Sequence, residues 1–144
     1  MFEFDRLRTV LAFADGGSRG NPGPAAWGAV LEQDGKDIAT LNAYLGIATN
    51  NVAEYTGLVM VLEKAAELGI KDLEVRMDSE LVVKQMLGQY RVKNAGLIPL
   101  YEKAKMLSSR FPNFRIVHVR REYNKKADQL ANQAMDMAAG QAQS

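Results

Sequence analysis

Four carboxylates in this 144-residue chain stand where one predicted secondary-structure element ends and the next begins. Asp15 and Asp78 each follow a short apolar run, whereas Glu54 and Asp128 lie in the first turns of predicted helices. Carboxylates that converge from four elements would repel each other strongly in a low-dielectric interior. They can coexist with cations between them, and hard oxygen ligands favour Mg²⁺ or Mn²⁺. The four positions therefore predict a divalent-metal site, provided that the fold brings them together.

Each carboxylate also has an ordinary structural explanation when it is taken singly. Asp15 could form a turn with the glycine after it, and Asp78 could cap the helix that follows. Glu54 stands where a capping box has its acidic residue, and Asp128 would gain about 0.3–1 kcal/mol from a helix dipole. Capping does not require the four to share one edge of a sheet, where open α/β sheets have their sites. Their joint placement therefore favours a common site.

Apolar periodicity and turn residues predict an alternating order of strands and helices around these carboxylates. Three strands over residues 8–14, 27–32 and 37–47 come first, with an Asp-Gly hairpin turn between the second and third. The later elements are a helix that is capped by Asn50 or Asn51 and ends at Gly69, strands over 73–77 and 114–119, and helices over 79–87, 97–111 and 125–138. This order predicts an α/β fold with a mixed five-stranded sheet, three antiparallel strands then two parallel ones, and helices on both faces.

Composition indicates one ordinary domain and excludes several chemistries. The chain is 47% hydrophobic and 24% charged, has a net charge of +1, and contains no cysteine. Disulfides, thiolate zinc sites and cysteine nucleophiles are therefore excluded, and the single histidine, His118, excludes a two-histidine metal site. We expect His118 to be a strand residue. We expect one domain over residues 1–144, with a core over about 8–138 and a frayed tail over 139–144.

Targeting signals are absent from the sequence. The first residues contain no basic segment followed by an apolar one, and no apolar run is long enough to span a bilayer. We therefore expect no signal peptide, no membrane association and a cytoplasmic protein.

Four local phrases, in this order, resemble the type 1 ribonuclease H family. They are Asp15-Gly-Gly-Ser-Arg-Gly-Asn-Pro-Gly-Pro-Ala, Thr49-Asn-Asn-x-x-Glu, Asp78-Ser and Ala127-Asp-x-Leu-Ala. The resemblance covers about residues 10–136, and its first two phrases are highly specific. It implies the ribonuclease H-like fold and an endonuclease that hydrolyses the RNA strand of RNA–DNA hybrids. Two Mg²⁺ ions, or Mn²⁺ as the alternative, would assist that reaction and leave 5′-phosphate and 3′-hydroxyl ends.

The resemblance also implies roles for individual residues. Asp15 would bridge the two ions, and Asp128 would help to hold the ion that activates the attacking water. Glu54 and Asp78 would hold the ion at the leaving 3′-oxygen. The implied substrate contacts are the RNA sugar at Gly16, Gly17 and Ser18, the minor groove at Asn50 and Asn51, and a phosphate of the DNA strand at Asn21, Thr49 and Asn94.

Two departures from the family distinguish this chain as a short form. Many members carry a histidine in a glycine-rich loop before the last aspartate, but residues 119–124 contain none, and Glu122 is the candidate auxiliary residue there. Some members carry a long basic protrusion, whereas residues 88–96 offer only Arg91 and Lys93. We therefore expect weaker substrate affinity. The remaining positive surface would come from Lys84, Arg120, Arg121, Lys125 and Lys126.

Two other functions are compatible with the same fold. One is a non-catalytic module that binds hybrids, and the other is a transposase-like or integrase-like nuclease. A binding module has no need to keep four like charges together, and the compact length argues against the second function. The sequence therefore predicts a monomeric ribonuclease H whose partner is an RNA–DNA hybrid and which requires no protein partner.

Overall fold

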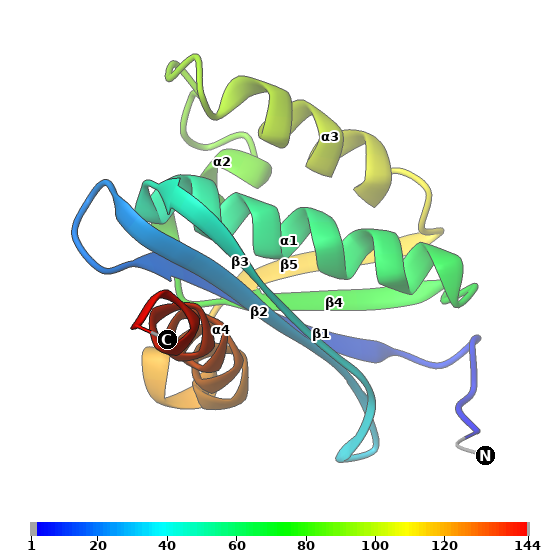
Figure 1. The fold of residues 1–144 in the computed structure, drawn as a ribbon. Helices are drawn as coiled ribbons and strands as arrows, with labels where there is room; N and C mark the ends of the chain where they lie inside the picture. The colour runs from blue at the N-terminus through cyan, green and yellow to red at the C-terminus, as the bar shows by residue number, and fades with distance from the viewer. Residues whose placement is uncertain (1–2, 144) are drawn as a thin grey trace.

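The computed structural model describes residues 3–143 and shows a five-stranded sheet with helices on both of its faces (Figure 1). The strands are β1 (Val10–Ser18), β2 (Gly23–Gln33), β3 (Lys36–Ala48), β4 (Asp72–Met77) and β5 (Asn113–His118). Their order in the sheet is β3-β2-β1-β4-β5. The first three strands pair antiparallel, and β4 and β5 are parallel to β1. The predicted fold class is therefore confirmed.

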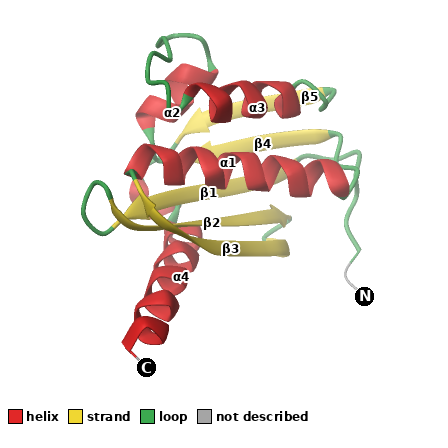
Figure 2. Cartoon of the chain, turned by 45° about the horizontal axis from the view of Figure 1, so that its top comes forward, coloured by secondary structure: helices red, strands yellow, loops and turns green. Residues whose placement is uncertain are grey.

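The helices divide into two layers around this sheet. One face carries α1 (Asn50–Glu67), α2 (Glu80–Met86) and α3 (Ile98–Ser108), and the opposite face carries α4 (Lys125–Gln143), which crosses the strands in Figure 2. A short 3-10 turn, η1 (Arg121–Tyr123), leads into α4. No helix within residues 3–143 combines the length and apolar character that a bilayer crossing requires.

The hydrophobic core lies between the sheet and α1, and it covers a wide arc of α1. Tyr55, Leu58, Val61, Leu62 and Ala65 are all fully buried. The reason is that α3 packs against the side of α1 that faces away from the sheet (Figure 1). A helix with neighbours on two sides buries a wide arc rather than one stripe.

The glycine-rich segment after Ala14 is strand, not the predicted turn. β1 continues to Ser18, and its residues from Asp15 onward pair with β2, which begins at Gly23. The turn itself covers residues 19–22 and contains a cis peptide bond before Pro22. Pairing with a long neighbouring strand has therefore overridden the local preference of two consecutive glycines for a turn.

Helix boundaries also differ from the prediction, and α3 ends at Ser108 rather than at residue 111. The cap of α1 is Thr49 rather than an asparagine, because the Thr49 hydroxyl accepts a 3.2 Å hydrogen bond from the backbone N–H of Val52. At the other end of the chain, α4 extends five residues beyond the predicted end at Ala138. Residues 139–143 are helical rather than frayed, because alanine and glutamine favour a helix enough to include Gly140. Residue 144 of the predicted tail lies outside the described residues.

Candidate active site

The parallel pairing of β1 with β4 brings Asp15 and Asp78 side by side. Phe13 is the partner of Arg76 in this ladder, and each aspartate stands two residues further along its own chain. Because neighbouring strands are about 4.7–4.9 Å apart, the two carboxylates project from adjacent positions at one edge of the sheet. The strand order of the sheet, in which β1 and β4 are neighbours, is therefore what brings the two carboxylates together.

Glycines bring the first turn of α1, and with it Glu54, against the end of β1. A Cβ atom at Gly16 would overlap the backbone of Ala53, and one at Gly57 would lie 2.9 Å from the carbonyl oxygen of Asp15. The helix can approach the strand this closely because both positions lack a side chain. Gly16 therefore has a packing role in addition to the predicted contact with the RNA sugar.

We expect alanine to reduce stability at Gly16 but to have little effect at the adjacent Gly17. Gly16→Ala should lower the free energy of unfolding by about 3 kcal/mol, because the new methyl group must displace the backbone of α1. Gly17→Ala is the matched control, since its Cβ would meet Asn50 Oδ1 at an ordinary 3.8 Å, and stability should change by less than about 1 kcal/mol. Urea unfolding of both variants measures the difference, and equal stabilities would contradict the packing role.

A third close approach brings Asp128 to the same place from the opposite face of the sheet. A Cβ atom at Gly28 would overlap the carbonyl oxygen of Ala127, so the first turn of α4 lies directly on β2. Gly28 is also the residue of β2 that pairs with Asp15. The start of α4 therefore rests beside β1 at Asp15, where the Asp128 carboxylate contributes to the raised pKa of Asp15.

All four carboxylates line one pocket of about 520 Å³. The predicted Gly16, Gly17, Ser18, Asn21, Asn50 and Asn51 line it too. Within residues 3–143, however, no three acidic or histidine side chains are close enough together to form a ready-made metal cluster. The carboxylates thus surround the pocket, and they do not already converge on one point.

Burial and the neighbouring carboxylates disfavour a negative charge on Asp15. Burial is the larger cause, followed by the charge of Asp78, with a smaller contribution from Asp128, and together they raise the pKa of Asp15 to about 8. A hydrogen bond of 2.9 Å from the backbone N–H of Gly16 to Asp15 Oδ1 opposes this shift. An aspartate with such a high pKa stands where a cation would be strongly attracted.

Glu54 is perturbed in the same direction. Burial raises its pKa, and the charge of Asp78 adds to this effect, while a hydrogen bond with the Ser79 side chain opposes it. The Glu54 Oε2 atom is buried and has no hydrogen-bond partner among the described residues. A buried carboxylate oxygen without a partner is costly, and coordination of a cation would compensate it.

The raised pKa of Asp15 predicts how stability depends on pH in a chelator. Because the folded pKa, about 8, exceeds the unfolded value near 3.9, folding favours the protonated carboxyl. The contribution of the protonated Asp15 carboxyl to the free energy of unfolding is complete below about pH 4 and is lost as pH rises through about 8. Asp15→Asn removes the titration, so it should stabilise the protein at pH 8 by at least about 1 kcal/mol, or roughly 3–5 °C in Tm, and much less at pH 5. Thermal unfolding at both pH values tests this, and a difference independent of pH would contradict it.

Three predicted site residues lie outside the pocket. Thr49 caps α1, and Asn94 Oδ1 accepts a 2.7 Å hydrogen bond from the backbone N–H of Gly96 in the loop before α3. Glu122 lines a separate hollow with Phe13, so the structure does not bring this candidate auxiliary residue to the carboxylates. The single histidine, His118, is the last residue of β5, as expected, and it is exposed.

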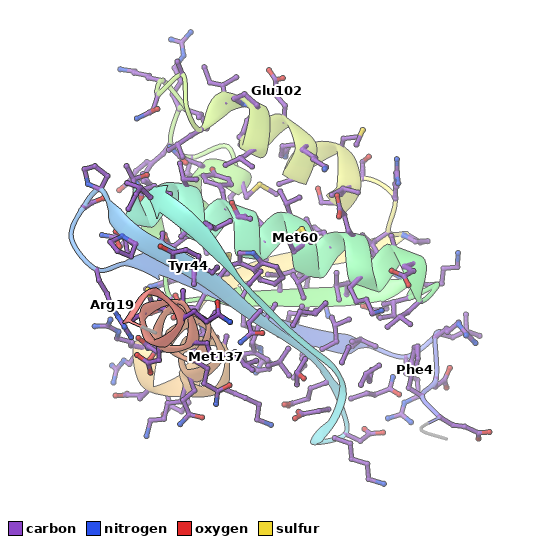
Figure 3. The ribbon with its side chains drawn as sticks, viewed as in Figure 1. Phe4, Arg19, Tyr44, Met60, Glu102 and Met137 are labelled. Atoms are coloured by element: carbon purple, nitrogen blue, oxygen red, sulfur yellow. The ribbon has the colours of Figure 1, made fainter. Side chains whose placement is uncertain are left out.

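Four polar side chains line the pocket without having been singled out as site residues. Arg121 comes from η1 and Arg19 from the turn after β1, and they are the two cationic residues of the lining. Figure 3 shows Arg19 beside α4, where it forms a 2.6 Å ion pair with Asp136. Ser79 and Asn132 are the other two. In the sequence, the doublet Arg120-Arg121 indicates a basic residue close to Asp128. Sequence spacing alone does not say which of the two arginines faces the pocket.

Comparisons with known proteins place this chain in a known family. A family model described as reverse transcriptase-like matches residues 13–134. Ribonuclease HI of Halobacterium salinarum is 46% identical over 135 residues, which are 93% of this chain and 68% of that protein. The chain therefore belongs to the ribonuclease H family.

Longer relatives and solved structures agree with this assignment. The bifunctional protein Rv2228c of Mycobacterium tuberculosis is 48% identical over 132 residues, which are 90% of this chain but only 36% of that protein. This chain thus spans about a third of the length of that relative. The solved N-terminal RNase H domain of Rv2228c superimposes with a TM-score of 0.89 over 93% of this chain and 98% of that one. LC11-RNase H1, solved in complex with an RNA/DNA hybrid, is 43% identical, with a TM-score of 0.85 over 90% of this chain and 99% of that one.

Proposed function

We propose that this chain hydrolyses the RNA strand of RNA–DNA hybrids as a metal-dependent endonuclease that leaves 5′-phosphate and 3′-hydroxyl ends. The observation that carries the proposal is the single pocket lined by Asp15, Glu54, Asp78 and Asp128. The complex of LC11-RNase H1 with an RNA/DNA hybrid supports the choice of substrate, since that protein shares the fold over nearly its whole length.

The residues of the pocket fit divalent cations. Carboxylate oxygens are the hard ligands that Mg²⁺ and Mn²⁺ prefer. The partnerless oxygen of Glu54 and the raised pKa of Asp15 both mark positions that a positive charge would stabilise. Asp15, Glu54, Asp78 and Asp128 would hold two such ions, which when bound activate a water nucleophile and stabilise the leaving oxygen.

The chain's own polar groups would position the substrate beside the carboxylates. The Oδ1 atom of Asn50 accepts hydrogen bonds of 2.8 and 3.0 Å from the backbone N–H and the hydroxyl of Ser18. Asn21 Oδ1 accepts a 3.1 Å bond from the backbone N–H of Asn50. Because its oxygen is directed at Ser18, the amide NH₂ of Asn50 is the group that can donate to a nucleic acid. Arg19 and Arg121 add the positive charge that a phosphate backbone requires.

One chain supplies the whole lining of this pocket. No second copy is needed to complete the carboxylates or the asparagines around them. We therefore propose that the protein acts as a monomer and needs no protein partner for cleavage.

The test of the proposed function is cleavage of an end-labelled RNA–DNA hybrid in the presence of Mg²⁺, Mn²⁺ or a chelator. We expect cleavage of the RNA strand with either metal and none in the chelator, because the metal contributes several kcal/mol of transition-state stabilisation. Labelling each strand in turn and mapping the ends shows which strand is cut and which ends remain. Hybrid binding without cleavage under every condition would instead indicate a non-catalytic binding module.

A further inference from the structure

Asn124 is a buried amide that connects the elements of the pocket from behind. It is 2% exposed and lies between η1 and α4. Its Nδ2 atom donates one hydrogen bond of 3.0 Å to the carbonyl oxygen of Ala14 and another of 2.9 Å to Asp78 Oδ1. Its own backbone carbonyl accepts a 3.2 Å bond from the N–H of Asp128. One residue thus contacts β1 at the residue before Asp15, the side chain of Asp78 and the helix turn that carries Asp128.

The two hydrogen bonds that the NH₂ group of Asn124 donates are the ones that determine the orientation of the amide. Both bonds of Nδ2 go to acceptors, and Asn124 Oδ1 is buried without a hydrogen-bond partner among the described residues. A flipped amide would point its oxygen at the Ala14 carbonyl and at the Asp78 carboxylate, two oxygens that it would repel. The NH₂ group therefore fixes the direction of Asp78 Oδ1 and leaves the second oxygen of that carboxylate for the pocket.

We infer that Asn124 is a positioning residue, which orients the Asp78 carboxylate and holds the start of α4 at the end of β1 so that the carboxylates can bind divalent metal together. Asn124 is not part of the pocket lining, so it acts through Asp78 and Asp128 and does not touch the substrate. Groups that hydrogen-bond to metal ligands typically change metal affinity or activity by about 10–100-fold when they are removed. This inference rests on the proposed function, since it assumes that the carboxylates bind metal.

The main test measures metal binding to the free protein by calorimetry for the wild type, Asn124→Ala and Asn124→Asp. We expect Asn124→Ala to weaken Mn²⁺ or Mg²⁺ binding by about 10–100-fold and to raise the metal concentration for half-maximal cleavage in parallel. Hybrid affinity in a chelator should change by less than about threefold, because the Asn124 side chain does not line the pocket and bonds only Ala14 and Asp78, not Ser18, Asn21 or Asn50. Asn124→Asp keeps the shape but turns an acceptor toward the Ala14 carbonyl and Asp78, so its metal affinity should be no better than that of the alanine variant.

Gln33→Ala is the matched control for the loss of a buried amide. Gln33 is 6% exposed, and its side chain bonds the backbone of Asp5, far along β2 from the pocket. This variant should lose stability but keep wild-type metal affinity. If Gln33→Ala weakens metal binding as much as Asn124→Ala does, the effect is one of general stability and the inference is overturned. Wild-type metal affinity in Asn124→Asp would also overturn it, since shape alone would then suffice.

A measurement on the wild type keeps the inference testable if the Asn124 variants do not fold. Metal binding to Asp78 must alter its hydrogen bond to Asn124, so the side-chain NH₂ resonances of Asn124 should shift when Mg²⁺ is added, whereas those of Gln33 should not. Metal binding without any shift at Asn124 would overturn the inference. A wild-type protein that neither binds metal nor cleaves a hybrid would overturn the proposed function itself, whereas a fully active Asn124→Ala protein would overturn only the role of Asn124.

Discussion

Asp15→Asn should reduce cleavage of an RNA–DNA hybrid by at least about a thousandfold. Burial and two neighbouring carboxylates raise the pKa of Asp15, so this aspartate stands at the centre of the negative charge in the pocket. An amide is a weaker metal ligand than a carboxylate, and loss of about 4 kcal/mol of the metal's contribution to the transition state corresponds to a thousandfold. Asp78→Asn should have a similar effect. Single-turnover cleavage at saturating enzyme measures both.

Two comparisons separate this loss from a loss of folding or binding. Asp15→Asn should retain hybrid affinity, because Ser18, Asn21 and Asn50 contribute to the pocket independently of its charge. Asp34→Asn removes the same charge at an exposed residue, 62% accessible and paired with Arg8, and should retain full activity. Substantial cleavage by Asp15→Asn would refute the assignment of the carboxylates.

The second large effect concerns the sugar of the substrate. The protein should cut the RNA strand of a hybrid and leave an all-DNA duplex intact, with a preference of about 10⁴ or more, because sites that hydrogen-bond a hydroxyl reject analogues without it by such factors. Gly17 lines the pocket beside Asn50 without a side chain, so a nucleic-acid backbone can approach the strand closely there. The 2′-hydroxyl is the group that such an approach can recognise.

Chimeric duplexes with one to five consecutive ribonucleotides in one strand measure this preference. Cleavage should require several ribonucleotides, because residues from β1 and from α1 both line the pocket and would contact sugars on either side of the cut. The same duplex built entirely of DNA is the control. Cleavage of that control at a comparable rate would favour a transposase-like or integrase-like nuclease.

The sequence by itself determined the order of the elements and which carboxylates stand at their ends. Hydrophobic periodicity and turn residues are local signals, so they predicted the mixed sheet and placed Asp78 directly after a strand, whereas β1 continues past Asp15 to Ser18. These features depend on residues close together in the chain.

Only the tertiary structure decided how these local elements meet. Position 16 must be glycine because the backbone of α1 leaves no room for a Cβ atom there. The hydrogen bonds of Asn124 join segments up to 110 residues apart in sequence. It is also the tertiary structure that brings Arg121, rather than Glu122, to the pocket. The physical reason is that strand pairing and helix packing depend on contacts between distant segments, and the spacing of residues along one chain does not reveal those contacts.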